Sequence, residues 1–276
     1  MRYFLSAAEE SIEAGYRDRL EAHGYRVAGT YDDDVIVLSL GGDGSILYNS
    51  RRYEEPTILP VAGPGSEANT IDVDEDTLLE RLTTLEDGSR GTDYRLETHR
   101  KLAATREGEP IREDFDALND VHLHHADPGR AAKFTVRVLD TAESSGGSGG
   151  GIEGASGEDR ADREQVVYEA DRVISDGVLV ATPFGSSAYY RSITGGFFRT
   201  GIGVAFNNTH KPIDAPRSIG LSEAGRIELS LLSTTRASSA VLARDDDPDL
   251  YELDPGEPAS ISLSDRTVAI VRFDSE

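Results

Sequence analysis

The sequence lacks cysteine altogether and has only three lysines among its 276 residues. Without cysteine the chain forms no disulfide bond and builds no zinc site from thiolates. No apolar run approaches the roughly 20 residues that a helix needs to cross a bilayer. The N-terminal segment turns acidic after a short apolar start, unlike a signal peptide. We therefore expect a cytoplasmic protein that does not bind membranes.

Positive charge is also scarce. Lys and Arg total 28 against 51 Asp and Glu, and the formal net charge is −23. Because a nucleic-acid-binding protein needs a basic face toward the phosphates, this balance argues against a nucleic-acid partner. Concentrated salt screens the repulsion among carboxylates, which then keep the protein soluble. The charge therefore favours a protein adapted to a salt-rich cytoplasm over an ordinary acidic soluble protein.

The first third of the chain has an α/β pattern. Residues 1–7 predict a strand and residues 8–23 a helix. Continuous apolar runs at 35–40 and 57–61 are typical of parallel strands that are buried on both faces. Residues 75–86 favour a second acidic helix.

After residue 95 short β-rich segments separated by turn residues dominate, which is typical of an antiparallel sandwich or barrel. The expected strands are 99–105, 118–124, 133–139, 166–174, 177–182, 218–222, 226–232, 239–243, 259–263 and 267–273. Residues 141–163 are rich in Gly, Ser and acidic residues and predict a flexible loop. The fold class is thus α+β with two domains: an N-terminal α/β, Rossmann-like domain at 1–95 and a C-terminal antiparallel β-rich domain at 96–276.

A glycine-rich loop follows the first buried strand as Gly41-Gly42-Asp43-Gly44-Ser45. Successive glycines let backbone N–H groups face an anion, and the N-terminus of a following helix adds favourable partial charge. A carboxylate in such a loop would repel phosphate, but it makes sense if Asp43 accepts a proton from an attacking hydroxyl or binds Mg²⁺. On glycine spacing alone, a tight turn with a helix-capping Asp accounts for the motif equally well.

Two further motifs carry hydrogen-bonding groups. Asn119-Asp120 ends a short apolar run and can hold ribose hydroxyls or a base edge, although such a pair is more often a turn. The segment 175–190 brackets a strand between an Asp-Gly turn and a turn rich in hydroxyls, Thr182, Ser186 and Ser187. With the ring of Tyr189, these are the groups needed to bind the sugar and phosphate of a nucleotide.

Three histidines lie close together at His122, His124 and His125. His122 and His124 share one strand face, but no cysteine or carboxylate stands at ligand spacing, and a metal usually needs three fixed ligands. We interpret them as surface or cleft histidines rather than as a metal site, and we assign no metal ligand.

Together the three motifs resemble the NAD kinase family, in which GGDG[TS] on an α/β domain precedes an Asn-[Glu/Asp] pair and then DG-xxx-TPTGSTAY on a β domain. This chain has them in the same order, as GGDGSIL at 41–47, ALNDV at 117–121 and SDGVLVATPFGSSAY at 175–189. The resemblance covers residues 33–62 and 95–222. It implies a nucleotide site between the domains and transfer of a phosphoryl group from ATP, with Mg²⁺ or another divalent cation, to the 2′-hydroxyl of the adenosine ribose of NAD, forming NADP.

The resemblance also implies roles for single residues. Asp43 would be the general base or a metal-linked carboxylate, with Gly42 and Gly44 facing phosphate. Asn119 and Asp120 would contact the ribose and adenine of NAD. The other expected substrate- and nucleotide-binding residues are Asp176, Thr182, Ser187, Ala188, Tyr189 and Ser192. Asp176 is expected to reach the substrate in its own or a neighbouring subunit of a homo-oligomer.

Two alternatives stay open at this point: a related GGDG-loop kinase that acts on another small polyol or sugar, and a nucleotide-binding homologue without activity. The intact Asp43 argues against the second, because a pure binder would gain by losing a negative charge near phosphates. The sequence departs from the family pattern where Phe184 replaces a threonine, where Arg217 replaces a histidine, and at residues 63–69, which contain no aromatic side chain.

Overall fold

A computed structural model describes residues 1–63, 71, 73–88, 90–127, 131–141, 164–233 and 240–273. Residues 142–163 of the predicted acidic loop and residues 64–69 of the glycine-rich segment lie outside these ranges. Among the described residues, no helix is long and apolar enough to cross a membrane.

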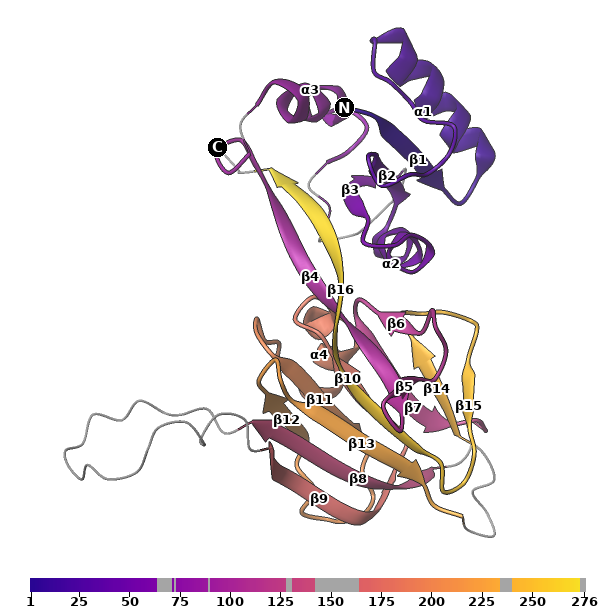
Figure 1. Ribbon diagram of the computed structural model, residues 1–276, viewed down its shortest axis with the longest axis vertical. Helices are drawn as coiled ribbons and strands as arrows, with labels where there is room; N and C mark the ends of the chain where they lie inside the picture. The colour runs from indigo at the N-terminus through magenta and orange to yellow at the C-terminus, as the bar shows by residue number, and fades with distance from the viewer. Residues whose placement is uncertain are drawn as a thin grey trace, which may run out of the picture.

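The chain forms two stacked parts, and two long strands run from one part to the other (Figure 1). The upper part holds three short parallel strands and three helices: β1 (Tyr3–Ala7), α1 (Glu10–Ala22), β2 (Ile36–Gly41), α2 (Asp43–Arg52), β3 (Thr57–Ala62) and α3 (Leu78–Asp87). The long strands are β4 (Tyr94–Arg106) and β16 (Pro258–Phe273). The C-terminal half of β16 pairs in parallel with β3, so the end of the chain completes the sheet that its beginning starts.

Burial on both faces explains the continuous apolar runs of β2 and β3. Leu38 and Leu59 pack under α1 and α3, whereas Val37 and Ile58 pack under α2. The sheet is therefore covered by helices on both sides, which is the arrangement predicted from the runs.

The lower part is an antiparallel sandwich. One layer is made by β13 (Arg226–Leu231), β8 (Ala132–Thr141) and β9 (Glu164–Ser175), added beside the N-terminal half of β16. The facing layer has the order β12 (Ser218–Leu221), β11 (Ile202–Asn207), β10 (Gly177–Ala181), β7 (Asp120–His125), β14 (Ala240–Arg244) and β15 (Tyr251–Leu253). The largest apolar cluster lies between these layers and includes Phe134, Val180 and Ile261. Two short strands, β5 (Glu109–Pro110) and β6 (Asp116–Ala117), flank β4.

The predicted fold class is confirmed, with an α/β sheet carrying helices and an antiparallel β-rich part. Several details of the predicted elements were wrong, and the short strands β5 and β15 were not predicted. Residues 259–263 and 267–273 belong to one strand, β16, whose register shifts between Leu263 and Thr267 instead of breaking. Strand β11 was missed, as was the short helix α4 (Tyr189–Thr194). The division at residue 95 stays a prediction, because β4 and β16 belong to both parts.

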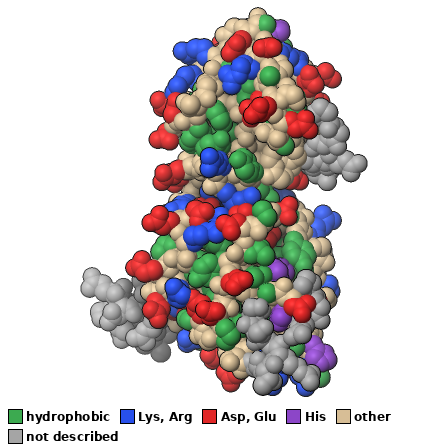
Figure 2. Space-filling view, turned by 90° about the vertical axis from the view of Figure 1, so that its right-hand side faces the viewer, with side chains coloured by type: hydrophobic (Ala, Val, Ile, Leu, Met, Phe, Trp, Pro, Cys, Tyr) green, Lys and Arg blue, Asp and Glu red, His purple; other side chains and the backbone are tan. Residues whose placement is uncertain are grey.

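Charged side chains are distributed unevenly over the face in Figure 2. Acidic side chains are spread over both parts, and basic side chains lie at the narrow waist between the parts as well as on the upper part. Ion pairs near this waist include Arg51 with Asp247 and the buried Lys101 with Asp116. Lys101 Nζ also donates to the carbonyl of Ser50 in α2, so the pair joins the two parts.

Candidate active site

The glycine-rich loop joins the end of β2 to the start of α2. Gly41 has a φ of +156°, and a Cβ there would lie 3.0 Å from Ser45 Oγ. The Ser45 N–H and hydroxyl both donate to the Gly42 carbonyl, at 3.0 and 2.7 Å, which closes the loop into the first helical turn. Asp43 and Gly44 are exposed in that turn, and a Cβ at Gly44 would meet nothing within 4 Å. The loop thus offers an open helix N-terminus, which is suited to an anion.

Helix α2 is fixed on the sheet by a buried polar network. Asn49 Nδ2 donates to Ser39 Oγ at 3.0 Å, and Ser6 Oγ donates to Asn49 Oδ1 at 2.7 Å. Because these groups are buried, each needs its partner, and together they set the position of the helix along the strands. The network thereby fixes where α2, which begins at Asp43, stands on the sheet.

The predicted pair Asn119-Asp120 lies between β6 and the start of β7. Backbone N–H groups of residues 118, 119 and 120 donate to the carboxylate of Asp245, which is buried. Burial, with a contribution from the negative charge of Asp245, raises the pKa of Asp120 to about 7. Burial also raises the pKa of Asp245 to about 6, although the three N–H donors oppose this.

The hydroxyl-rich turn contacts the same segment from the other side. Thr182 Oγ1 donates to the Leu118 carbonyl at 2.5 Å, and the Thr182 N–H donates to the Asn119 carbonyl at 2.9 Å. A Cβ on Gly185 would lie 2.2 Å from the Asn119 carbonyl oxygen, so only glycine fits there. The second and third sequence motifs are therefore packed directly together.

Both motifs also pack against α2. Leu118 and Phe184 belong to one apolar cluster with Ile46 and Leu47, and Ile46 lies three residues beyond Asp43. The ring of Phe184 meets His99 of β4 edge-on, with centroids 5.0 Å apart. The fold thus brings the glycine-rich helix, the Asn119-Asp120 pair and the Thr182–Ser187 turn to one junction.

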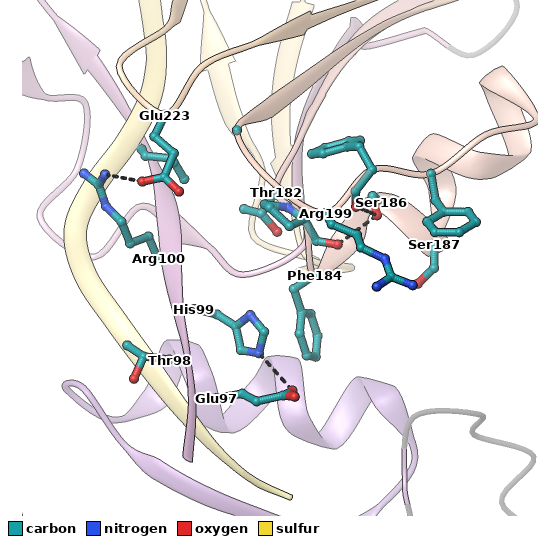
Figure 3. Close-up of a pocket in the computed structure, with 15 residues that line it drawn as sticks. Glu97, Thr98, His99, Arg100, Thr182, Phe184, Ser186, Ser187, Arg199 and Glu223 are labelled. Atoms are coloured by element: carbon teal, nitrogen blue, oxygen red, sulfur yellow. Dashed lines mark hydrogen bonds and ion pairs between the residues drawn. The ribbon is translucent and has the colours of Figure 1, made fainter. Parts of the chain in front are cut away.

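A hollow of about 650 Å³ opens beside this turn (Figure 3). Thr182, Ser187 and Phe184 line it from the turn, Glu97–Arg100 from β4, and Arg199 and Glu223 from two loops. Arg199 is exposed and extends toward Ser187, whereas Arg100 pairs with Glu223 at 3.7 Å. Arg199, hydroxyls and aromatic rings therefore line one hollow together with the carboxylates of Glu97 and Glu223, and the hydroxyls and rings suit the sugar and base of a nucleotide.

Two of the other predicted nucleotide-binding residues line a second hollow of about 560 Å³. Tyr189 and Ser192 of α4 line it, together with Asn207, Asn208 and Arg217. Asn207 Nδ2 donates to the Tyr189 hydroxyl at 3.1 Å.

Asp176 belongs near this second hollow, because it accepts a hydrogen bond of 2.8 Å from Asn208 Nδ2. Asp176 and Thr182 stand at opposite ends of β10, about 20 Å apart at the usual rise per strand residue. The site expected from sequence is thus divided between two hollows, with exposed Ala188 at the turn between Ser187 and Tyr189.

The histidines behave as side chains of a packed sheet. His122 and His124 lie on one face of β7 with ring centroids 5.0 Å apart, and the Tyr189 ring meets His122 edge-on at 5.3 Å. Burial, helped by His124, lowers the pKa of His122 to about 3, so this ring is neutral at physiological pH. Within the described ranges, no group of three or more His, Asp or Glu side chains could hold a metal ion.

Sequence reasoning missed Asp245 and Arg199. Asp245 starts a run of three aspartates, a pattern that predicts an exposed turn, and its partners are about 125 residues away. Arg199 offered a weak signal, since it stands ten residues after Tyr189 and follows the glycines at 195 and 196.

Comparisons with known proteins point to one family. No protein-family model matches the chain. An NAD kinase of Methanopyrus kandleri is 27% identical over 243 residues, covering 87% of this chain and 73% of that protein. An NAD kinase of Azoarcus sp. strain BH72 is 28% identical over 206 residues, covering 74% of this chain and 60% of that protein. The match therefore spans less than two thirds of the Azoarcus protein.

Solved structures share the whole fold. An NAD kinase from Archaeoglobus fulgidus in complex with ATP matches with a TM-score of 0.68 and 17% identity, covering 100% of this chain and 94% of that one. Yeast NADH kinase complexed with NADH matches with a TM-score of 0.73 and 14% identity, covering 100% of this chain and 84% of that one. At these identities the likeness establishes the fold.

Proposed function

We propose that this chain, which belongs to the NAD kinase family, transfers the terminal phosphoryl group of ATP to the 2′-hydroxyl of the adenosine ribose of NAD and forms NADP. The observation that carries the proposal is the junction at the start of α2. The helix that begins at Asp43 shares one apolar cluster, through Ile46 and Leu47, with Leu118, which precedes Asn119-Asp120, and with Phe184 of the Thr182–Ser187 turn. A carboxylate in a phosphate-type loop beside two sugar-binding segments suits proton removal from a ribose hydroxyl.

In the proposed reaction Asp43 accepts the proton of the 2′-hydroxyl while the hydroxyl oxygen attacks the γ-phosphorus of ATP and ADP leaves. The open backbone at Gly42 and Gly44 faces the phosphates, and the helix N-terminus stabilises their negative charge. Asn119 and Asp120 orient the ribose by hydrogen bonds. Exclusion of water from the junction would suppress the hydrolysis of ATP, which competes with phosphoryl transfer to the ribose.

A divalent cation fits this donor set. Mg²⁺ is usually bound by one or two carboxylates together with substrate phosphates rather than by an all-protein cage. Asp43 and the phosphate oxygens would hold it, and its charge would neutralise the charge that develops on the transferring group. A magnesium site of this kind therefore does not require a cluster of three carboxylates among the described residues.

We assign the two hollows to two parts of the substrates. A phosphate-bearing nucleotide would lie beside the junction, in contact with Thr182, Ser187 and Ala188. A nucleotide at the second hollow would contact Tyr189, Ser192 and Asp176. Because the two ends of β10 lie about 20 Å apart, the second group is suited to a neighbouring subunit of a homo-oligomer. The cytoplasmic location and the absence of a nucleic-acid partner stay predictions from composition.

The excess of 23 acidic charges leads us to propose that the enzyme works in concentrated salt. The test of function is therefore run in molar KCl with purified protein, ATP, Mg²⁺ and NAD, and NADP is detected with an NADP-specific dehydrogenase. The proposal requires NADP in amounts equal to the ADP formed. ADP without NADP would point to another acceptor, such as a different polyol, and absence of both products would favour a binding protein.

A further inference from the structure

Asp245 is buried, which is unusual for the first residue of a run of three aspartates. Its side chain is only 3% exposed, whereas the next residue, Asp246, is exposed. Both residues have a left-handed backbone, with φ of 45° and 56°. Two successive non-glycine residues in this region are strained, and such strain persists only where the surroundings fix the conformation.

The surroundings are the backbone of the Asn119-Asp120 segment. Asp245 Oδ2 accepts the Leu118 N–H at 2.6 Å, and Oδ1 accepts the N–H groups of Asn119 at 2.7 Å and Asp120 at 3.2 Å. The Asp245 N–H donates in return to the Asp120 carbonyl at 3.2 Å. Hydrogen bonds to an ionised acceptor are about twice as strong as neutral ones. One carboxylate thus determines the path of three successive residues.

The opposite side of the segment is bonded to the Thr182 turn, which donates to the carbonyls of Leu118 and Asn119. The segment is therefore held through its N–H groups on one side and its carbonyls on the other. Because these hydrogen bonds hold the backbone, they also set the directions in which the side chains of Asn119 and Asp120 point from it.

Asp245 also contacts the helix that carries Asp43. Its carbonyl accepts a hydrogen bond of 2.6 Å from Nη1 of Arg51, in the last turn of α2. The same residue therefore bonds to the proposed ribose-binding segment through its side chain and to the phosphate-loop helix through its backbone.

We propose that Asp245 is a positioning residue for phosphoryl transfer: its carboxylate sets the Asn119-Asp120 pair against α2 so that the ribose hydroxyl arrives at Asp43. Asp245 itself touches no substrate. The inference rests on the proposed function, and its consequence is specific. Loss of the carboxylate disturbs the binding of the acceptor, whereas the backbone bond to Arg51 remains.

The variant that tests this is Asp245→Asn, which keeps the size of the side chain but replaces one acceptor oxygen with a donor. At least one backbone N–H then faces an N–H group instead of an oxygen. We expect the KM for NAD to rise about tenfold or more, since small misplacements of a bound group are costly, while the KM for ATP stays within about twofold. Asp246→Asn removes the same charge from the exposed neighbour and should leave both constants unchanged.

A matched structural control is Asp140→Asn. The Asp140 carboxylate also accepts a backbone N–H, that of Ser222 at 2.9 Å, but it makes no contact with residues 118–120 in the described structure. This variant should lower the melting temperature without changing the KM for NAD. If Asp245→Asn behaved in the same way, with a lower melting temperature and an unchanged KM, Asp245 would be merely structural and the inference would be overturned.

Hydrogen exchange of a peptide covering residues 117–122 separates this inference from the proposed function. In Asp245→Asn the amides of Leu118, Asn119 and Asp120 should lose protection while those of β8 keep theirs. Unchanged protection overturns the inference even if the wild type makes NADP. If the wild type makes no NADP, the proposed function fails, and the affinity for NAD measured by calorimetry in the wild type and the variant decides the role of Asp245: a fall supports it and equal affinity overturns it.

Discussion

At the scale of single residues, Asp43 is the side chain on which the proposed chemistry depends. Asp43→Asn keeps the size of the side chain in an exposed turn, so folding should be nearly unaffected. Turnover should fall by about 10²–10⁴-fold, the usual contribution of a general base. The measurement is kcat for NADP formation beside nucleotide affinity from calorimetry. A kcat within a few-fold of the wild type would remove Asp43 from the mechanism.

Asp120 gives a prediction about pH. Because its pKa is raised to about 7 in the fold from an ordinary value near 4, the folded state holds a proton that the unfolded state has lost between these values. The contribution of Asp120 to stability is therefore greatest below about pH 4 and is lost as pH rises through about 7. Asp120→Asn should melt at a higher temperature than the wild type at about pH 8, and the gap should shrink toward pH 4. A gap that is constant across this range would show that Asp120 ionises freely in the fold.

Single residues could be predicted from the sequence where they belong to a short motif of neighbouring residues. Thr182 and Asn119 each stood in a short motif, and the structure brings those motifs into contact. Asp245 could not be found in this way, because a run of three aspartates is normally solvated and its burial depends on donors about 125 residues away. The position of Tyr189 and Ser192 at the second hollow was equally hidden, since it depends on the course of α4 after Ser187.

At the scale of elements, the buried parallel strands were the most predictable parts, because a short apolar run between turn residues is typical of a strand buried on both faces. Strand β11 was missed because glycines interrupt its run. The glycine at 203 is required by packing, since a Cβ there would lie 2.3 Å from the ring of Phe198. The break expected within β16 is a register shift, and the strand continues because β4 pairs with it on both sides of the irregularity.

Two glycines in different elements give opposite predictions for the same substitution. Gly185→Ala places a methyl group against the Asn119 carbonyl, so the turn must move away, and both the melting temperature and the affinity for NAD should fall. Gly44→Ala meets no protein atom and adds a better helix former to α2, so the melting temperature should hold or rise. The KM for ATP should still increase, because the methyl group occupies space that the phosphates approach. Thermal melting and steady-state kinetics of the two variants check this. Equal destabilisation would show that the open space at Gly44 is absent in solution.

At the scale of the whole molecule, β4 and β16 make the two parts one continuous sheet. Residues more than 200 positions apart pair side by side, as Ile58 does with Ile270. The proposed site lies where this sheet, α2 and the β-rich part meet, so its geometry depends on contacts across the waist. The sequence predicted an α/β part and a β-rich part but not this shared sheet, because residues 259–263 and 267–273 were both assigned to the β-rich part.

The charge of the whole molecule leads to the last prediction. Even if every Lys and Arg were paired, an excess of 23 acidic charges would remain without a partner. The screening length is about 3 Å in 1 M salt and about 30 Å in 0.01 M salt, so dilution lets carboxylates across the surface repel one another. The melting temperature should therefore fall steeply as KCl is diluted from molar to about 10 mM, and activity should fall with it. NaCl at the same ionic strength should restore stability equally well, because screening depends on the ionic strength and not on the salt chosen. Melting that is independent of KCl would mean that the acidic surface does not destabilise the fold, and the proposed adaptation to salt would have to be abandoned.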